Sequence, residues 1–184
     1  MSRILLRLAE VWTPPALKNK ALSELAGLTA DAFGSSRVPR LKGRAWPDRI
    51  EAYALFTRNE ADRALAHPEE LSFLRSRLRE RAFGFGERLR RRFGVSSREE
   101  VLRVARLLYR TIGIDFRGLP DGDVLIRACG FSRHYSGEVC SLISALDEGV
   151  LAGLAGGGRL EFRERLTEGG TACRAVFVFE QKRP

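Results

Sequence analysis

The stretch DVLIRACGFSRHYSGEVCSLISALDEGVLAGLAGGGRLEFRERLTEGGTACRAVFVF, residues 123–179, decides the fold that we expect for this chain. Its first six residues are largely apolar and partly β-branched, which is typical of a strand. Ser136 can cap a helix that runs to Leu154, where a run of glycines ends it. Apolar and polar residues then alternate over 159–167 and over 173–179, on either side of a glycine turn. The stretch therefore predicts a strand, a long helix and an antiparallel hairpin.

The residues before this stretch carry helical patterns, because apolar side chains recur there every three or four positions. Ser96 or Ser97, followed three residues later by a glutamate, forms a capping box. We expect helices over about 1–12, 15–33, 47–66, 68–93 and 98–112. We expect residues 115–122, which hold two glycines and a proline, to form a connector without regular structure.

This order of elements predicts the fold class. A helical half followed by strand, helix and hairpin favours an α+β fold over alternating α/β units. The 184 residues suit a single domain over 1–184. In it, a helical part, 1–113, packs on a small antiparallel sheet whose part of the chain, 114–184, also holds one long cysteine-bearing helix.

The charge balance makes nucleic acid a partner to consider, because the net charge is +9. Almost all of the basic residues are arginine, which can also reflect genome composition. The basic segments RERAFGFGERLRRRFG and SSRVPRLKGR match no diagnostic nucleic-acid motif. We therefore place nucleic acid below a small-molecule ligand.

The chain shows no targeting signal and no membrane span. The opening residues MSRILLRLAEVW lack both a continuous apolar core and a small-residue cleavage site. No apolar run approaches the roughly 18–20 residues needed to cross a bilayer. Three cysteines, an odd number, favour free thiols in a reducing compartment. We expect a cytoplasmic protein without a membrane partner.

The long helix carries the first group of candidate site residues. Helical geometry puts Cys140, Ser144 and Asp147 on one face, beside an apolar stripe. Cys140 lies in the first turns, where the helix dipole favours a thiolate, which would be a nucleophile. The alternative is that Cys140 is a buried apolar residue and Asp147 is solvated.

The three thiols suggest a second possibility, a metal site. If the sheet packs on the long helix, Cys129, Cys140 and Cys173 could converge. Zinc accepts three thiolates together with His134, Asp147 or Glu148. The long gaps between the cysteines differ from the spacing of zinc fingers and ribbons, so zinc is one option beside no cofactor at all.

Arginines on the first hairpin strand suggest how a ligand is held. Arg163 and Arg165 could clamp a carboxylate, since a guanidinium group matches its geometry. The alternative is a solvated strand face. A carboxylate-bearing small molecule is therefore the partner that we expect.

Five segments resemble a known family: YRTIGIDFRG, IRACGF, VC, ALDEGVLAGL and GGRLEFRERLTEGGTACRAVF. Over Leu108 to Phe179 they are similar to the L-2-amino-thiazoline-4-carboxylic acid hydrolase family of bacterial proteins. The resemblance implies a helical N-terminal part, cysteine-bearing strands and an Asp-bearing helix. The matching positions are Cys129, Cys140, Asp147, Arg163 or Arg165, Thr167, Gly169 or Gly170, and Cys173.

The resemblance implies hydrolytic opening of a small cyclic, amidine-like substrate. An arginine would hold the substrate carboxylate, with Ser144 and Thr167 also in the binding site. Either Cys140 attacks as a thiolate or Asp147 activates a water, and His134 protonates the leaving group. Similar cysteine and glycine positions occur in small-molecule-binding domains of the 4-vinyl-reductase type. A non-enzymatic ligand or metal sensor is therefore the alternative function.

Overall fold

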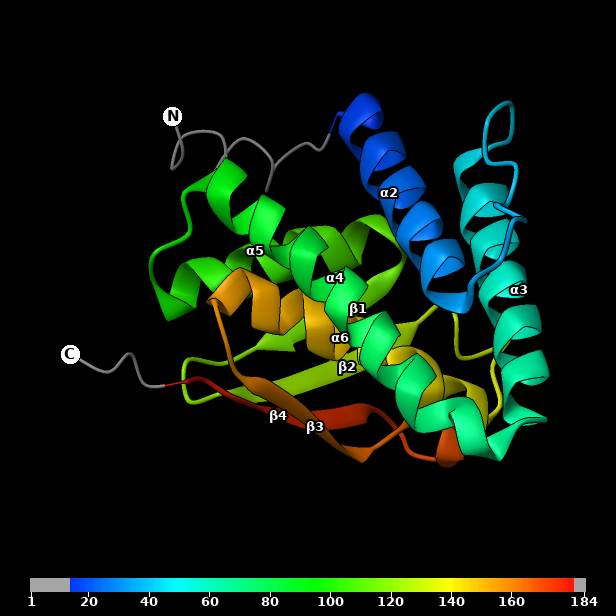
Figure 1. Cartoon of the computed structure of the whole chain (residues 1–184). Helices are drawn as coiled ribbons and strands as arrows, with labels where there is room; N and C mark the ends of the chain where they lie inside the picture. The colour runs from blue at the N-terminus through cyan, green and yellow to red at the C-terminus, as the bar shows by residue number, and fades with distance from the viewer. Residues whose placement is uncertain (1–13, 181–184) are drawn as a thin grey trace.

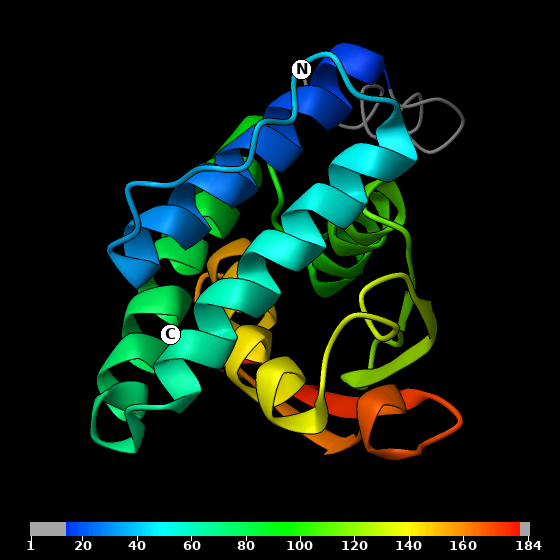
Figure 2. The same cartoon turned by 90° about the vertical axis from the view of Figure 1, so that its right-hand side faces the viewer.

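The computed structural model describes residues 14–180, and the helix expected over residues 1–12 lies outside them. The described chain forms four helices, then two strands, a fifth helix and two further strands (Figures 1 and 2). The helices are α2 (Pro15–Phe33), α3 (Trp46–Leu65), α4 (Leu71–Phe93), α5 (Arg98–Thr111) and α6 (Gly137–Ala155). The strands are β1 (Ile114–Gly118), β2 (Asp123–Cys129), β3 (Arg159–Glu164) and β4 (Cys173–Val178). Two short 3₁₀ turns are η1 (Pro68–Glu70) and η2 (Leu166–Glu168).

Local sequence signals fix the ends of several helices. Gly34 ends α2 in the left-handed conformation, with φ of 66°. Ser97 and Glu100 form the capping box at the start of α5. The Ser136 hydroxyl accepts a hydrogen bond of 3.2 Å from the Val139 amide and so caps α6. These helix boundaries agree with the sequence patterns because the signals act within one or two turns.

The strands form one antiparallel sheet in the order β1-β2-β4-β3. Two hairpins, β1–β2 and β3–β4, join through the pairing of β2 with β4. The connector expected over 115–122 is wrong in its first half, because β1 occupies residues 114–118. Ile114 and Phe116 are buried, so they alternate with exposed neighbours as in a strand with one covered face. Only residues 119–122 form the turn.

The helices α2–α6 all lie on one side of the sheet, and α5 and α6 pack on it (Figure 1). The other side of the sheet carries exposed side chains. The fold is therefore α+β, with the helical half covering a four-stranded antiparallel sheet, which confirms the predicted class.

Helix α4 packs closely along α6 because glycines face each other across the contact. A Cβ added at Gly149 on α6 would lie 2.7 Å from the Cβ of Ala82 and would overlap the carbonyl oxygen of Arg79. Gly153 and Gly86 form a second close approach of the same kind. Glycine at these positions lets the two backbones touch, so this contact fixes the distance between α4 and α6.

A methyl group at this contact should destabilise the protein. We expect Gly149→Ala to lower the free energy of unfolding by ~2 kcal/mol, because overpacking of a tight contact commonly costs ~1–3 kcal/mol. Gly27→Ala is the matched control, since no atom lies within 4 Å of a Cβ at that position in α2. Gly27→Ala should raise the free energy of unfolding by roughly 0.5–1 kcal/mol. Urea denaturation measures both, and equal effects would contradict the packing argument.

Candidate functional site

One face of α6 lines a cavity. The lining residues from this helix recur at steps of three and four positions, as one helical face requires. They are Cys140, Ile143, Ser144, Leu146, Asp147 and Val150. Gly149 and Gly153 lie on the opposite face against α4. One face of α6 therefore packs against α4, and the opposite face lines the cavity.

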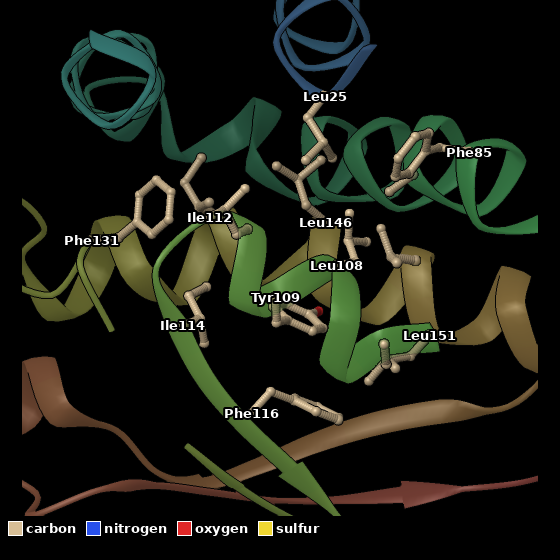
Figure 3. Packing of buried hydrophobic residues seen from close by; sticks show 14 of the residues in the cluster. Leu25, Phe85, Leu108, Tyr109, Ile112, Ile114, Phe116, Phe131, Leu146 and Leu151 are labelled. Atoms are coloured by element: carbon tan, nitrogen blue, oxygen red, sulfur yellow. The ribbon is translucent and has the colours of Figure 1, made fainter. Parts of the chain in front are cut away.

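The cavity has a volume of about 90 Å³. Its walls come from α2, α3 and α6, from the end of α5 and the start of β1, from β2 and the loop after it, and from η2 and β4. Leu108, Ile112 and Ile114 make part of the apolar wall, which Figure 3 shows around Tyr109. The cavity is smaller than the ~150 Å³ cavity known to bind benzene, so it holds several waters or a molecule of few non-hydrogen atoms.

Asp147 is the carboxyl group of this cavity. Its Oδ1 accepts a hydrogen bond of 2.8 Å from the Tyr109 hydroxyl. Asp147 is partly accessible because it borders the cavity. Within residues 14–180, its Oδ2 accepts no hydrogen bond and the carboxyl forms no ion pair. Asp147 thus keeps one acceptor atom for whatever occupies the cavity.

The surroundings of Asp147 favour its neutral form. Burial raises the pKa of this carboxyl group from 3.8 to about 6. The Tyr109 hydrogen bond and the Arg165 charge lower this pKa, and the neighbouring Glu148 raises it. A carboxyl group with a pKa of about 6 can take up and release a proton near neutral pH.

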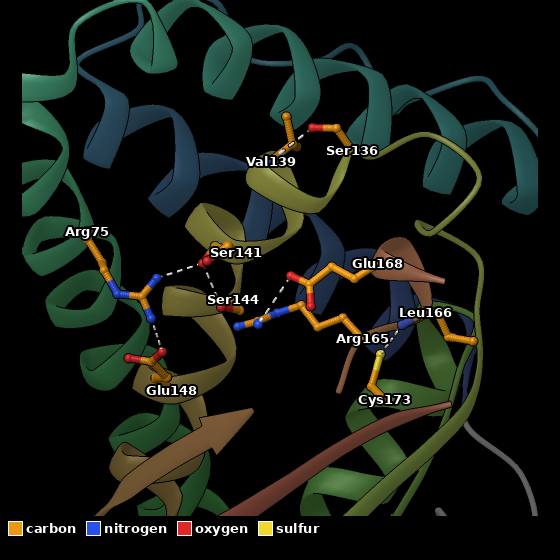
Figure 4. A network of polar contacts seen from close by, with 10 residues as sticks. All are labelled: Arg75, Ser136, Val139, Ser141, Ser144, Glu148, Arg165, Leu166, Glu168 and Cys173. Carbon is orange, nitrogen blue, oxygen red and sulfur yellow. Dashed lines mark hydrogen bonds and ion pairs between the residues drawn. The ribbon is translucent and has the colours of Figure 1, made fainter. Parts of the chain in front are cut away.

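Glu148, a candidate zinc ligand, points away from the cavity. Its carboxylate pairs with the Arg75 guanidinium on α4, which also donates a hydrogen bond of 2.6 Å to the Ser141 carbonyl (Figure 4). Glu148 is therefore part of the α4–α6 contact. Of the two adjacent carboxyl groups of α6, Glu148 faces α4 and Asp147 lines the cavity.

All three cysteines line the same cavity, and all are free thiols. Burial raises the pKa of Cys129 to about 12 and also raises the pKa values of Cys140 and Cys173. The expectation of a Cys140 thiolate at the start of α6 is thus wrong in direction. Loss of hydration outweighs the helix dipole, whose effect is confined to the first turn. The thiols are neutral at pH 7.

The residues predicted to bind zinc do not come together as a metal site. Among residues 14–180, no three histidine, cysteine, aspartate or glutamate side chains lie close enough together to hold a metal ion. Cys129, Cys140 and Cys173 border one cavity but belong to different walls of it, on β2, α6 and β4. Lining a common cavity is a weaker condition than the tetrahedral contact that zinc requires.

Two predicted site residues lie away from the cavity. His134 is in the loop after β2, where its Nε2 accepts a hydrogen bond of 3.0 Å from Arg133. Arg163 is exposed on the uncovered side of the sheet, beside Arg174. Neither lines the cavity. The alternation along β3, read from sequence, did not reveal which side of the sheet the helices cover.

The residues of η2 border the cavity from below α6. Thr167 lines it. The Thr167 hydroxyl is close enough to Cys140 to lower the pKa of that thiol, but its buried Oγ1 meets the criteria for a hydrogen bond with none of the described residues. Arg165 lies over the Phe162 ring, 4.7 Å from its centroid, and pairs with Glu168 at 3.6 Å. Its Nε is buried without a partner. Ser144 and Thr167 therefore line the cavity, and Arg165 is their neighbour.

The sequence analysis missed three tyrosines that line the cavity: Tyr53, Tyr109 and Tyr135. Tyr109 follows the helical spacing of the buried face of α5, which was a usable signal for burial. Its hydrogen bond to Asp147 joins residues 38 positions apart and has no local signal. Tyr53 and Tyr135 reach the cavity from α3 and from the loop before α6.

Comparisons with protein-family models, with curated proteins and with solved structures found no match to this chain. The helices of the described residues do not combine the length and apolar character needed to cross a membrane. Reasoning about function therefore rests on the cavity and its residues.

The raised pKa of Asp147 predicts a pH-dependent stability. In the unfolded chain the pKa is near 3.8 and in the folded protein about 6, so folding binds a proton between these values. The contribution of Asp147 to the free energy of unfolding is therefore greatest below about pH 4 and is lost as the pH rises through 6. Relative to Asp147→Asn, wild type should lose ~3 kcal/mol of unfolding free energy between pH 4 and pH 8, at ~1.4 kcal/mol per pKa unit.

Urea denaturation of both proteins at pH 4, 6 and 8 measures this difference. Other titrating groups cancel because they are common to both proteins. Glu51→Gln, at an exposed carboxyl group on α3 that does not line the cavity, serves as the control. If the difference in free energy of unfolding between wild type and Asp147→Asn stays constant with pH, the raised pKa of Asp147 is contradicted.

Proposed function

We propose that this protein binds a small, largely apolar molecule in the α6 cavity, with Asp147 as its polar anchor. The observation that carries the proposal is Asp147 Oδ2, which accepts no hydrogen bond from a described residue and belongs to a carboxyl group bordering a mostly apolar cavity. A carboxylate oxygen without a partner at such a surface is a candidate for ligand recognition.

The shape of the site supports binding of a small ligand. Small-molecule sites are concave and mostly apolar, with a few polar groups that fix orientation. The α6 cavity has this composition: leucine, isoleucine and valine side chains surround one carboxyl group, six hydroxyl groups and three thiols. The resemblance to ligand-binding domains of the 4-vinyl-reductase type points to the same class of function.

Binding can be tested with an uncharged probe, 1-propanol, by NMR titration of the backbone amides. We expect saturable shifts at Ile143, Ser144, Asp147 and Val150, because these residues share the cavity-lining face of α6. Ile143→Trp should abolish the shifts by filling the cavity. Ile50→Trp on α3 is the control, since Ile50 does not line the cavity and binding should persist. Shifts spread evenly over the surface would contradict the proposal.

Hydrolysis of a small cyclic amidine, as the family resemblance implies, is a second candidate function. One observation favours it: a carboxyl group with a pKa of about 6 suits a general base that activates water. The neutral thiols make Cys140 a poor nucleophile in comparison. The catalytic role, if the protein is an enzyme, belongs to Asp147.

The two catalytic roles give different mutant activities on 2-amino-thiazoline-4-carboxylate. Asp147→Asn should lower kcat by ~100-fold or more, the usual range for loss of a general base. Cys140→Ser should keep kcat within about threefold, because a neutral thiol contributes no nucleophile. Steady-state turnover measures both. The reverse order, with Cys140→Ser inactive and Asp147→Asn active, would assign the chemistry to the thiol.

A further inference from the structure

The hydrogen-bonding capacity of the cavity wall indicates the chemical class of its ligand. This inference rests on the proposed binding function and adds which ligand the cavity selects. A hydroxyl group has one hydrogen to donate and two lone pairs that accept. Where that hydrogen is already used, the hydroxyl can only accept. The bonds made by each hydroxyl of the wall therefore decide what the cavity offers.

The Tyr53 hydroxyl has its hydrogen in use. Thr29 Oγ1 donates its own hydrogen to the Leu25 carbonyl at 2.7 Å. The 3.0 Å contact between Thr29 Oγ1 and the Tyr53 hydroxyl must then take its hydrogen from Tyr53. Towards the cavity, Tyr53 presents lone pairs only.

Tyr135 is bound in the same way. Thr57 Oγ1 donates to a carbonyl of its own helix, that of Ala54 at 2.9 Å or of Tyr53 at 3.1 Å. The Tyr135 hydroxyl contacts Thr57 Oγ1 and so supplies the hydrogen of that bond. Tyr135 also faces the cavity as an acceptor.

The remaining hydroxyls of the wall follow the pattern. Ser144 Oγ donates to the Ser141 carbonyl at 2.7 Å, and Ser132 Oγ donates to the Cys129 carbonyl at 2.7 Å. Tyr109 donates to Asp147. Of the hydroxyls that line the cavity, Thr167 alone keeps its hydrogen, and its oxygen is shielded from the cavity space. The wall is therefore rich in acceptors and poor in donors.

The charges around Asp147 agree with this pattern. The groups that act on it are Tyr109, Glu148, Arg165, Tyr53, Cys129, Cys140 and Cys173. Arg165 is the cation among them, but it pairs with Glu168 and does not line the cavity. The tyrosines and thiols are neutral, because burial raises their pKa values. An ionised Asp147 therefore has no cation in contact with it among the described residues.

We propose that the cavity selects a small aliphatic ammonium ion. Its charged group donates to Asp147 Oδ2 and to the lone pairs of Ser144, which lies one helical turn away on the same face. Its short hydrocarbon part contacts the leucine and isoleucine wall. Charge-assisted hydrogen bonds in an apolar site are stronger than neutral ones, so the ammonium ion is preferred over an alcohol of equal size. A carboxylate is disfavoured because it would face acceptors and a second negative charge.

Three probes of equal carbon number test this selection: n-propylammonium, 1-propanol and propionate. Each is titrated into the whole protein at pH 7.5 and followed by NMR shifts of the cavity-lining face of α6. We expect n-propylammonium to bind at least tenfold more tightly than 1-propanol, and propionate more weakly than either. At pH 5 the ammonium affinity should fall about tenfold, because Asp147 is then mostly protonated.

Two variants separate charge recognition from fold. Asp147→Asn should remove the preference for n-propylammonium over 1-propanol, and a cooperative urea unfolding transition shows that the variant is folded. Glu148→Gln, the neighbouring carboxyl group bound to Arg75, should keep the preference for the ammonium ion. If 1-propanol binds and n-propylammonium binds no more tightly, the cation selection is wrong and the binding function stands. If none of the probes shifts the α6 residues, both proposals fail.

Discussion

The contact between α4 and α6 is the constraint on which the site depends. Gly86, Gly149 and Gly153 remove side chains from the contact, so the two helix backbones meet directly. One face of α6 is thereby fixed against α4, with the Arg75–Glu148 pair beside it (Figure 4). The opposite face is held at the distance that leaves a cavity above the sheet.

Loss of hydration is the force that gives the cavity its chemistry. It disfavours the charged form of every acid in the wall, so the three thiols and the tyrosines remain neutral. Asp147 starts from a much lower pKa and is raised only to about 6. The same apolar surroundings therefore leave one group that changes its charge near neutral pH. The chemistry of the site belongs to the carboxyl group rather than to the thiols.

Much of the fold could be predicted because its signals are local. The capping residues Ser97 and Ser136 and the terminal Gly34 mark helix ends within one turn. Strand β1 was missed because Gly118 lies within it and a proline soon after, and both residues indicated a loop. Glycine suits this position of the strand because a Cβ at residue 118 would lie 2.5 Å from Cδ2 of Leu102. That packing reason is invisible along the chain.

By itself, the sequence determined that Cys140, Ser144 and Asp147 share one face of a helix, since helical spacing is a property of the chain alone. It also determined the α+β order of the elements. Only the tertiary structure decided that this face borders a cavity, that Tyr109 binds Asp147, and that Arg163 lies on the uncovered side of the sheet. It likewise decided that the thiols are neutral. Each of these depends on burial and on contacts between distant residues, which the order of residues does not record.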